Sequence, residues 1–343
     1  MESVLAGKTV LVTGGTGSIG SEIVRQALTQ DASKVVVFSR DEIKHFMMKK
    51  RNTDDRLQTI IGDIRDPRSV EQVFSMSNID IIFHAAAMKH VVMCEDFPLE
   101  VVKTNIVGTQ NVVDMAVKCG VSKMITISTD KAAYPVNVMG ATKFIAEKIT
   151  LNANKISNND QAFSCVRFGN VASSRGSVIP VYIDNLLDQI PLQVTDPEVT
   201  RFVIEIPDAV KLIIKATEYT HGGEIFILKM RAFRLGDLVD VILNGIAPRL
   251  NIAKESIELN VIGLVPGEKL HEDLINDIES SRLCELDDMY VVLPDNESYP
   301  RRANMRRVSL PRYTSRDVEL ISREEIEEIV VKYLNNRWRD LYP

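Results

Sequence analysis

The sequence predicts an α/β protein with a doubly wound parallel sheet and a smaller, C-terminal α+β lobe. Short β-branched strands alternate with amphipathic helical patterns over the first half of the chain, and glycine-rich or polar turns follow the strands. The alternation weakens after about residue 170, and 343 residues are enough for a large α/β unit plus a second lobe. We expect the sheet domain to comprise 1–170 plus about 205–229. About 171–204 plus 230–343 then form the second lobe and a C-terminal tail.

The composition favours a soluble cytoplasmic protein. The net charge is −6 and the pI is near 5.6, so we expect no nucleic-acid binding. Four cysteines lack metal-ligand spacing, which predicts free thiols in a reducing compartment and no metal site. The chain has no run of about 18 apolar residues and no basic-then-apolar N-terminal pattern, so we expect no membrane insertion and no signal peptide.

The first expected strand, 8–12, leads into a glycine-rich loop and then into a helical pattern at 22–28. The glycine spacing fits the Rossmann dinucleotide fingerprint, in which missing side chains let backbone N–H groups approach a pyrophosphate. The preceding strand and following helix make the motif more specific than the glycines alone. We assign cofactor binding to Thr13, Gly14, Gly15, Thr16, Gly17, Ser18, Ile19 and Gly20.

The end of the second strand, 34–38, bears on the choice of cofactor, because Ser39, Arg40 and Asp41 follow it. A carboxylate at this point binds the ribose 2′-hydroxyl of NAD, whereas an arginine binds the 2′-phosphate of NADP. A guanidinium matches phosphate bidentately, so we favour NADP and leave NAD open. The alternative use of Arg40 is an ion pair with Asp41 or stacking on adenine.

Two further strand ends supply residues for the same ligand. The strand 57–61 leads to Asp63 and Ile64, and an acidic side chain there can accept a hydrogen bond from the adenine amino group. The strand 79–83 precedes three residues whose small side chains permit close passage of a cofactor: Ala85, Ala86 and Ala87. Lys89 comes just beyond them, within reach of a substrate. His84 and His90 lack a third ligand of suitable spacing, so we expect no metal there.

Residues 98–119 are expected to form one long helix that stops at Gly120. Asn105 on its inner face needs a hydrogen-bond partner, and backbone near the nicotinamide is our candidate. We therefore add Asn105 to the cofactor-binding residues.

The turn at 128–143 lies between an apolar β-branched run, 124–127, and an amphipathic helical segment. It contains Asp130, Lys131 and, twelve residues on, Lys143. Open α/β sheets bind ligands where a parallel strand ends, so we place the chemistry in this turn.

Beyond the sixth strand, 163–168, the expected elements are sparser. A strand at 192–195, a helix at 208–219, a strand at 223–228 and a helix near 236–243 follow. The last helix, 323 to about 336, begins with a capping box of Ser322 and Glu325.

Ten blocks of sequence between residues 10 and 272 resemble the extended branch of the short-chain dehydrogenase/reductase superfamily. They most closely resemble its UDP-N-acetylglucosamine 4,6-dehydratases of capsule and flagellar-glycan synthesis. The blocks are TGGTGSIG, FSRDE, GDIRD, HAAAMKHV, KTNIVGT, STDKAAYPVNVMGATK, RFGNV, SRGSVIP, TDPEVTRF and PGEKLHE.

The resemblance implies that NADP is the cofactor, that UDP-N-acetylglucosamine is the substrate and that Lys143 holds the nicotinamide ribose. It also implies a nucleotide-sugar site lined by Lys89, Met139, Asn170, Ser174, Arg175, Val178, Arg201 and Glu268. Arg175 and Arg201 are fixed cations suited to a diphosphate, although either is also open to a surface ion pair.

One departure from the superfamily pattern concerns the base. Most members have Tyr-x-x-x-Lys with a tyrosinate, but here Met139 precedes Lys143, and a thioether cannot accept a proton. A subset of the dehydratases is similar at this position, so the methionine counts against a generic epimerase or dehydrogenase more than against dehydration.

The resemblance implies an internal oxidation and reduction. Hydride leaves C4 of the sugar, water is lost across C5 and C6, and the same hydride returns to C6. We assign Lys131 as the base for C5. We expect Asp130, directly or through Thr129 or water, to take the C4 hydroxyl proton and deliver it to the C6 leaving group. An aspartate between two lysines should be ionised at rest, which suits it to accept that proton.

Three alternatives remain at this point. Tyr134 is a rival base, although Pro135 follows it and it should face elsewhere. A sugar 4-epimerase would use the same fold and the same hydride at C4. A decayed site that only senses NADP is the non-enzymatic alternative.

The stretch 301–307 is locally basic within an acidic chain. Such a run is usually a solvated face, but it could instead meet an acidic surface of a neighbouring subunit or cover a nucleotide. We expect the protein to be a homo-oligomer.

Overall fold

A computed structural model describes residues 3–158, 160–295 and 304–341. The chain divides into two compact units, each described by itself below. Unit 1 comprises 1–168, 207–229 and 275–312, and unit 2 comprises 169–206, 230–274 and 313–343.

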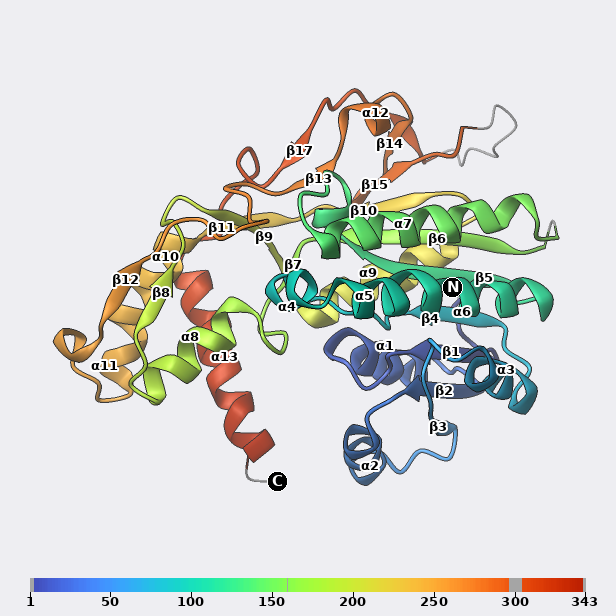
Figure 1. Ribbon diagram of the computed structural model, residues 1–343, viewed down its shortest axis with the longest axis horizontal. Helices are drawn as coiled ribbons and strands as arrows, with labels where there is room; N and C mark the ends of the chain where they lie inside the picture. The colour runs from blue at the N-terminus through green and yellow to red at the C-terminus, as the bar shows by residue number, and fades with distance from the viewer. Residues whose placement is uncertain (1–2, 159, 296–303, 342–343) are drawn as a thin grey trace. The chain divides into compact units, whose positions relative to one another are not determined.

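Unit 1 is built on a mostly parallel sheet, as the sequence predicted (Figure 1). The parallel strands are β3 (Leu57–Ile61), β2 (Lys34–Ser39), β1 (Thr9–Thr13), β4 (Ile81–His84), β5 (Lys123–Thr129), β6 (Ala162–Phe168) and β10 (Ile225–Leu228), in that spatial order. The register pairs Ser128 with Arg167 on adjacent strands. Three antiparallel strands continue the sheet beyond β10: β15 (Met289–Val292), β14 (Leu283–Glu285) and β16 (Arg306–Arg307).

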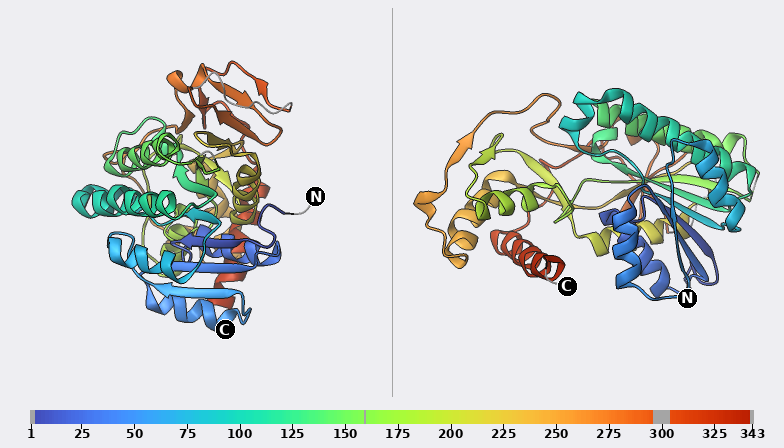
Figure 2. Two further views of the ribbon diagram at one scale, coloured as in Figure 1. Left: turned by 90° about the vertical axis from the view of Figure 1, so that its right-hand side faces the viewer. Right: turned by 60° about the horizontal axis from the view of Figure 1, so that its bottom comes forward.

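Helices cover both faces of this sheet (Figure 2). One face carries α3 (Pro67–Met76), α6 (Gly108–Lys118) and α7 (Val138–Asn152), and the other carries α1 (Ser18–Thr29) and α9 (Ile206–Tyr219). Gln26 on α1 donates to the Pro207 carbonyl of α9 (2.9 Å). Shorter helices complete the unit: α2 (Glu42–Arg51), α4 (Val91–Asp96), α5 (Pro98–Val101) and α12 (Asp277–Ser280).

The core of unit 1 forms where β-branched strands meet the apolar stripes of helices. Leu11, Val36 and Met124 from the strands are at most 1% exposed and pack against Val73 of α3 and Val112 of α6. Strands buried on both faces explain the continuous apolar runs in the sequence.

The expected helix at 98–119 is not one regular α-helix. It consists of α5, a π-helical segment (Val102–Val107) and α6. π-helical turns are rare, and this one contains Asn105, whose side chain is hydrogen-bonded as described below.

Residues 275–312 cluster with unit 1, whereas the sequence analysis assigned them to the second lobe. Antiparallel pairing of β15 with β10 and a buried ion pair between Glu279 and Arg167 join this segment to the sheet. Such pairing leaves no local periodicity that a sequence pattern could reveal.

Unit 2 contains small sheets and its own core. Its strands are β7 (Asn170–Val171), β8 (Leu192–Val194), β9 (Thr200–Ile204), β11 (Arg231–Arg234), β12 (Leu259–Val261), β13 (Asp273–Ile275) and β17 (Tyr313–Thr314). Its helices are α8 (Val178–Leu187), α10 (Leu235–Val241), α11 (Ala247–Arg249) and α13 (Arg323–Leu341), with a π-helical segment at Ile242–Ile246. The core includes Ile183 and Leu238, which are fully buried with Val330 of α13.

The expected start of the last helix is confirmed. Glu325 N–H donates to Ser322 Oγ (3.2 Å), and Ser322 N–H donates to the Glu325 carboxylate (2.8 Å). These reciprocal bonds are the capping box that the sequence indicated. Of the basic stretch 301–307, residues 301–303 lie outside the described residues, and Arg306 pairs with Glu285.

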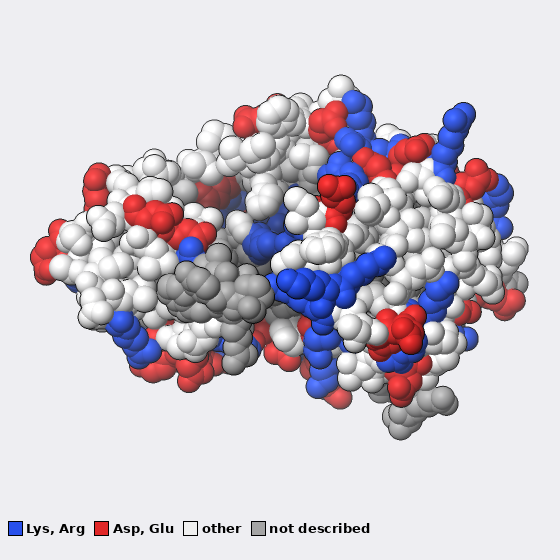
Figure 3. All heavy atoms as spheres, turned by 90° about the horizontal axis from the view of Figure 1, so that it is seen from below, with Lys and Arg blue, Asp and Glu red and all other residues white. Residues whose placement is uncertain are grey.

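On the face drawn in Figure 3, Lys and Arg side chains are interspersed with Asp and Glu side chains. No helix in the described part of the chain is both long and apolar enough to cross a membrane. The described residues also contain no group of three or more His, Cys, Asp or Glu side chains arranged to hold a metal ion.

Candidate functional site

The glycine-rich loop connects the end of β1 to the start of α1. Gly14 has φ +66°, and a Cβ there would lie 2.7 Å from the Ala86 backbone nitrogen. A Cβ on Gly20 would lie 2.3 Å from the Gly14 carbonyl oxygen. The loop therefore requires glycine at both positions, and its bare backbone fits the close approach of a pyrophosphate.

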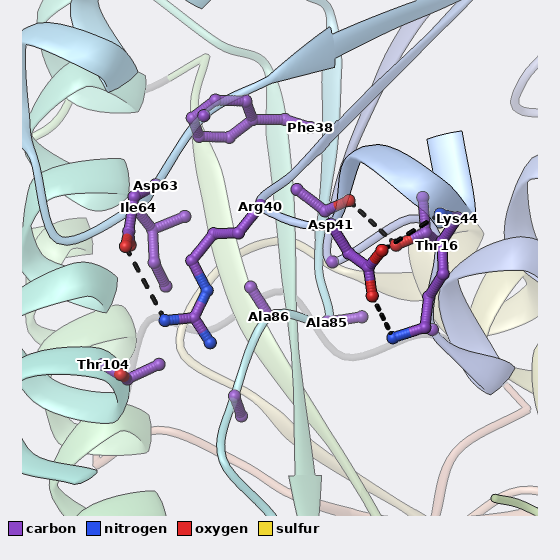
Figure 4. Close-up of a pocket in the computed structure, with 15 residues that line it drawn as sticks. Thr16, Phe38, Arg40, Asp41, Lys44, Asp63, Ile64, Ala85, Ala86 and Thr104 are labelled. Carbon is purple, nitrogen blue, oxygen red and sulfur yellow. Dashed lines mark hydrogen bonds and ion pairs between the residues drawn. The ribbon is translucent and has the colours of Figure 1, made fainter. Parts of the chain in front are cut away.

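A cavity of about 490 Å³ opens beside this loop (Figure 4). It is formed by the loop and by the ends of β2, β3 and β4 together with the π-helical segment. Its lining residues are Gly14, Thr16, Gly17, Phe38, Ser39, Arg40, Asp41, Lys44, Gly62, Asp63, Ile64, Ala85, Ala86, Ala87 and Thr104. Volume and position suit a bound nucleotide.

Several residues assigned to the cofactor from the sequence do not line this cavity as the described residues form it. Thr13 contacts His84, and Gly15 packs near Val37. Ser18, Ile19 and Gly20 lie in the first turn of α1, and Asn105 binds other protein groups.

Arg40 crosses the cavity towards Asp63 rather than towards its neighbour Asp41 (Figure 4). Arg40 and Asp63 are 3.7 Å apart, and half of the Arg40 side chain is exposed. Asp41 instead caps α2, because its Oδ1 accepts from Lys44 N–H (3.0 Å) while its Oδ2 pairs with Lys44 Nζ (2.6 Å). The hydrogen bond from the Lys44 side chain holds the pKa of Asp41 below its ordinary value. The Asp41 carboxylate, which could have bound a ribose hydroxyl, is thus already bound to Lys44.

Lys44 is a cavity residue that the sequence analysis missed, as are Phe38, Gly62 and Thr104. Lys44 could have been found from the helix start, since a cap at Asp41 places the residue three positions on beside it. Phe38, Gly62 and Thr104 adjoin assigned positions but carry no chemical signature of their own.

The turn after β5 holds the acid and the first lysine. Asp130 begins a short 3₁₀ turn (Asp130–Ala132) and is fully buried. Its Oδ1 accepts from Thr129 Oγ1 (2.6 Å), from Lys131 N–H (2.9 Å) and from Lys131 Nζ (3.1 Å). Its Oδ2 has no hydrogen-bond partner among the described residues. A buried oxygen without a partner is unusual in proteins and indicates a place for a ligand hydroxyl or water.

Lys143 lies on the first turns of α7 and is 7% exposed. Its Nζ donates to the Ile127 carbonyl of β5 (2.5 Å). Burial lowers the pKa of Lys143, and the nearby Cys165 and Glu147 partly oppose that shift. Lys143 is thereby held against the end of β5, the strand that immediately precedes Asp130.

The backbone partner of Asn105 is Met88. Its Oδ1 accepts from Met88 N–H (2.8 Å), and its Nδ2 donates to the Met88 carbonyl (3.1 Å) and to Thr142 Oγ1 (3.0 Å). These bonds fix the segment that leads to Lys89, a residue expected to contact the substrate.

Met139 sits in an apolar cluster and is 4% exposed. Cys94 and Val101 are the other buried members, and Met88 and Val91 pack against them. The position that usually carries a tyrosinate base is therefore occupied by a packed thioether.

Tyr134, the rival base, faces α12. Its hydroxyl accepts from Asp277 N–H (2.9 Å), and the Arg312 guanidinium lies 5.3 Å from its ring centroid. Burial raises the pKa of Tyr134, so the tyrosinate that a base would require is less populated at neutral pH.

His84 is buried between two threonines. Nδ1 is 2.7 Å from Thr13 Oγ1, and Nε2 is 3.0 Å from Thr109 Oγ1. Burial, with a smaller contribution from Lys143, lowers the pKa of His84 to about 3, so the ring is neutral at pH 7. The ring joins the ends of β1 and β4 to α6.

The remaining substrate residues expected from the sequence lie in unit 2. Arg201 of β9 pairs with Glu268 (2.7 Å) and donates to the Thr200 and Leu270 carbonyls. The structure brings Arg201 and Glu268 together in an ion pair, but the Arg201 side chain is only 9% exposed, so this is not the surface ion pair that the sequence left open. Asn170 lies in β7, Ser174 and Arg175 in the turn after it, and Val178 begins α8.

The fold and the glycine cradle define a Rossmann-like α/β protein with a cavity beside the glycine loop. This is the fold of the extended short-chain dehydrogenase/reductases. Asp130 and Lys131 follow β5 and Lys143 lies on α7, whereas Met139 in place of the usual tyrosine is a departure from that class. Comparison with known proteins narrows this further. Residues 10–294 match the family described as polysaccharide biosynthesis protein, and the chain belongs to that family.

Three proteins with similar sequences match most of the chain. A Methanocaldococcus jannaschii protein, named an uncharacterized membrane protein, is 43% identical, and the match covers 95% of this chain and 97% of that protein. The inverting UDP-N-acetylglucosamine 4,6-dehydratase of Campylobacter jejuni is 40% identical over 84% of this chain and 83% of its own. A UDP-glucose 4-epimerase of Rickettsia massiliae is 34% identical, and the match covers 94% of this chain and 95% of the epimerase.

A solved structure shares the whole fold. The X-ray structure of Pen from Bacillus thuringiensis superposes with a TM-score of 0.88 at 37% identity, covering 96% of this chain and 99% of that chain.

Proposed function

We propose that the protein is an NADP-dependent dehydratase that converts UDP-N-acetylglucosamine to a UDP-4-keto-6-deoxy-N-acetylhexosamine. The observation that carries the proposal is the buried Asp130, with one oxygen held by Lys131 and the other without a partner. An epimerase needs only oxidation and reduction at C4, whereas dehydration also needs an acid for C6 and a base for C5. The 40% identity to a dehydratase of that name supports this reaction.

NADP is supported by the charges at the end of β2. Arg40 and Lys44 line the cavity, and Asp41 is engaged as a helix cap. Two cations and a committed carboxylate favour a 2′-phosphate over a free 2′-hydroxyl. The weak 3.7 Å contact of Arg40 with Asp63 leaves the guanidinium able to turn towards a phosphate.

A bound nicotinamide supplies one piece of chemistry, which is to accept hydride from C4 and return it to C6. Asp130 Oδ2 takes the C4 hydroxyl proton as the ketone forms. Lys131, as the free amine, takes the C5 proton, which the ketone has made acidic. Asp130 then gives its proton to the C6 hydroxyl, which leaves as water while the C5–C6 double bond forms. When hydride adds to C6, the Lys131 ammonium returns a proton to C5, so atoms and charges balance.

The epimerase alternative is favoured by the second group of relatives, which are named UDP-glucose 4-epimerases and are 34% identical over nearly the whole chain. One experiment separates the two. Purified protein is incubated with UDP-N-acetylglucosamine and NADP in D₂O, and the product is followed by NMR. A new C6 methyl signal supports dehydration, and an unchanged C6 hydroxymethyl with an inverted C4 supports the epimerase.

We also propose a homo-oligomer in the cytoplasm. Val92 on α4, Leu99 on α5 and Phe97 between the two helices are at least half exposed, which is unusual for large apolar side chains so close together in the sequence. All four cysteines are free, and three are buried, in keeping with a reducing compartment. Light scattering after size-exclusion chromatography measures the assembly, and a monomer at micromolar concentration would contradict the proposal.

A further inference from the structure

A cluster of buried charges underlies the turn that carries Asp130. Arg167 of β6 has a fully buried side chain and binds two carboxylates. Its Nε and one terminal nitrogen donate to Glu147 (3.0 and 2.7 Å), and both terminal nitrogens donate to Glu279 (2.8 and 2.9 Å). Glu147 is fully buried and the Glu279 side chain is 5% exposed. The sequence analysis and the proposed mechanism use none of these three side chains.

The Glu147 carboxylate connects this cluster to the catalytic turn. Its Oε1 accepts from Ser128 Oγ (2.5 Å), and Ser128 lies two positions before Asp130 on β5. Glu147 also lies one helical turn after Lys143 on α7. Arg167 thus holds, through Glu147, both the strand end and the helix that present the proposed site residues.

The Glu279 carboxylate connects the cluster to α12. It caps that helix together with Asn276, whose side chain and backbone complete a capping box. From the same segment, Asn276 Nδ2 donates to the Ala133 carbonyl (3.2 Å), and Asp277 N–H donates to the Tyr134 hydroxyl (2.9 Å). The α12 segment is therefore hydrogen-bonded to the two residues that immediately follow the Asp130 turn.

We propose that Arg167 and Glu279 are positioning residues, which fix the Asp130 turn between β5 and the α12 segment so that it is preorganised for catalysis. This inference rests on the proposed function for its kinetic consequence, not for its geometry. A planar guanidinium bound bidentately on both sides admits few arrangements, so it transmits position better than a flexible ion pair. The formal charges of Lys143, Arg167, Glu147 and Glu279 cancel, and removing one carboxylate leaves a net buried positive charge.

The test compares two buried glutamates in the same unit. Glu279→Gln keeps the size of the side chain but removes one partner of Arg167. Glu224→Gln is the matched control, because Glu224 is also fully buried and accepts several hydrogen bonds, including those from Ser164, Thr220 and the His221 and Gly222 N–H groups. Glu224 immediately precedes β10, at the amino ends of the parallel strands, whereas the site lies at their carboxyl ends.

For Glu279→Gln we expect kcat to fall by about tenfold or more, while the KM for the nucleotide sugar and the affinity for NADP change by less than about threefold. For Glu224→Gln we expect a lower Tm with kcat per folded molecule retained. If kcat per folded molecule is the same in both variants, or if only KM rises in Glu279→Gln, the positioning proposal is wrong.

Hydrogen–deuterium exchange of the full chain with NADP gives a readout that does not depend on turnover. Glu279→Gln should increase exchange at 128–137 and leave the glycine loop at 13–20 unchanged, and Glu224→Gln should spare both segments. Unchanged exchange at 128–137 overturns the proposal. If the wild-type protein does not turn over a nucleotide sugar, the proposed function fails, and the exchange result still decides whether Arg167 and Glu279 hold this turn.

Discussion

Lys131 Nζ lies 3.1 Å from Asp130 Oδ1, while the second carboxylate oxygen of Asp130 has no partner among the described residues. The protein thus holds one oxygen with three donors, including the Thr129 hydroxyl, and leaves the other for a ligand. Because the acid and the amine come from consecutive residues on one turn, a change in either should interrupt a different step of the proposed reaction.

Asp130→Asn should stop the reaction before any hydride leaves C4, because an amide cannot take the C4 hydroxyl proton that the missing tyrosine would otherwise accept. Stopped-flow mixing with UDP-N-acetylglucosamine and NADP should show no absorbance of the reduced cofactor. The appearance of that absorbance at the wild-type rate would sink the proton-shuttle role.

Lys131→Met should interrupt the reaction later. Hydride transfer from C4 does not need the amine, so reduced cofactor should form on the first turnover, while loss of the C5 proton should slow by about 10²–10⁴-fold. NMR in D₂O then shows a sugar that keeps its C5 proton and its C6 hydroxyl. Deuterium at C5 in this variant would assign the base elsewhere.

Arg40→Ala should discriminate between the two dinucleotides. A charge-assisted hydrogen bond contributes about 1.5–3 kcal/mol, so we expect the Kd for NADP to rise about 10- to 100-fold and the Kd for NAD to change less than about threefold. Calorimetric titration with each cofactor measures both. Lys49→Ala, an exposed lysine of α2 that does not line the cavity, is the matched control. An equal loss for both cofactors would mean that Arg40 binds something other than the 2′-phosphate.

His84 predicts a pH dependence of stability. Its pKa is about 3 in the folded chain, below the ordinary value of 6.5, so the unfolded chain binds the proton first as the pH falls. The contribution of neutral His84 to the free energy of unfolding is complete above the ordinary pKa and is lost progressively as the pH falls towards 3. The loss is about 2 kcal/mol by pH 5. Urea unfolding of wild type and His84→Gln at pH 7.5 and pH 5 should show a smaller decline in the variant. His90→Gln, at an exposed position where burial lowers the pKa of the ring less, should reduce the decline by less than His84→Gln does. Parallel declines in His84→Gln and wild type would contradict this assignment.

Much of the sheet was predictable because each parallel strand carries its own signal. The β-branched run at 34–38 and the capping box at Ser322 are local patterns, and the structure contains both. The strands β14 and β15 were not predicted, because their place is decided by pairing with β10, far away in sequence. The π-helical segment Val102–Val107 was missed for a related reason: Asn105 within it is hydrogen-bonded to Met88 and Thr142, which are distant in the sequence.

The site shows the same division. Residue types that bind phosphate or move protons can be recognised in a sequence, and Arg40, Asp63 and the three alanines do line the cavity. Their pairings could not be read in the same way. Nothing local indicates that Arg40 reaches Asp63 while Asp41 caps a helix, or that Arg201 is bound to Glu268. Side-chain partners depend on which backbones the fold brings together.

The ion pair of Arg167 with Glu279 has a consequence for the folding of the chain during its synthesis on the ribosome. The two residues are separated by 112 positions, and β6 is complete on the ribosome long before α12 is made. Until then Arg167 has only Glu147 as a charged partner in this cluster, and β10 lacks its antiparallel neighbour. The nascent chain can therefore assemble the cofactor loop early, but the Asp130 turn gains its last support only when residues near 280 leave the ribosome. A chain truncated before that point should lose more of its catalytic activity than of its affinity for the dinucleotide.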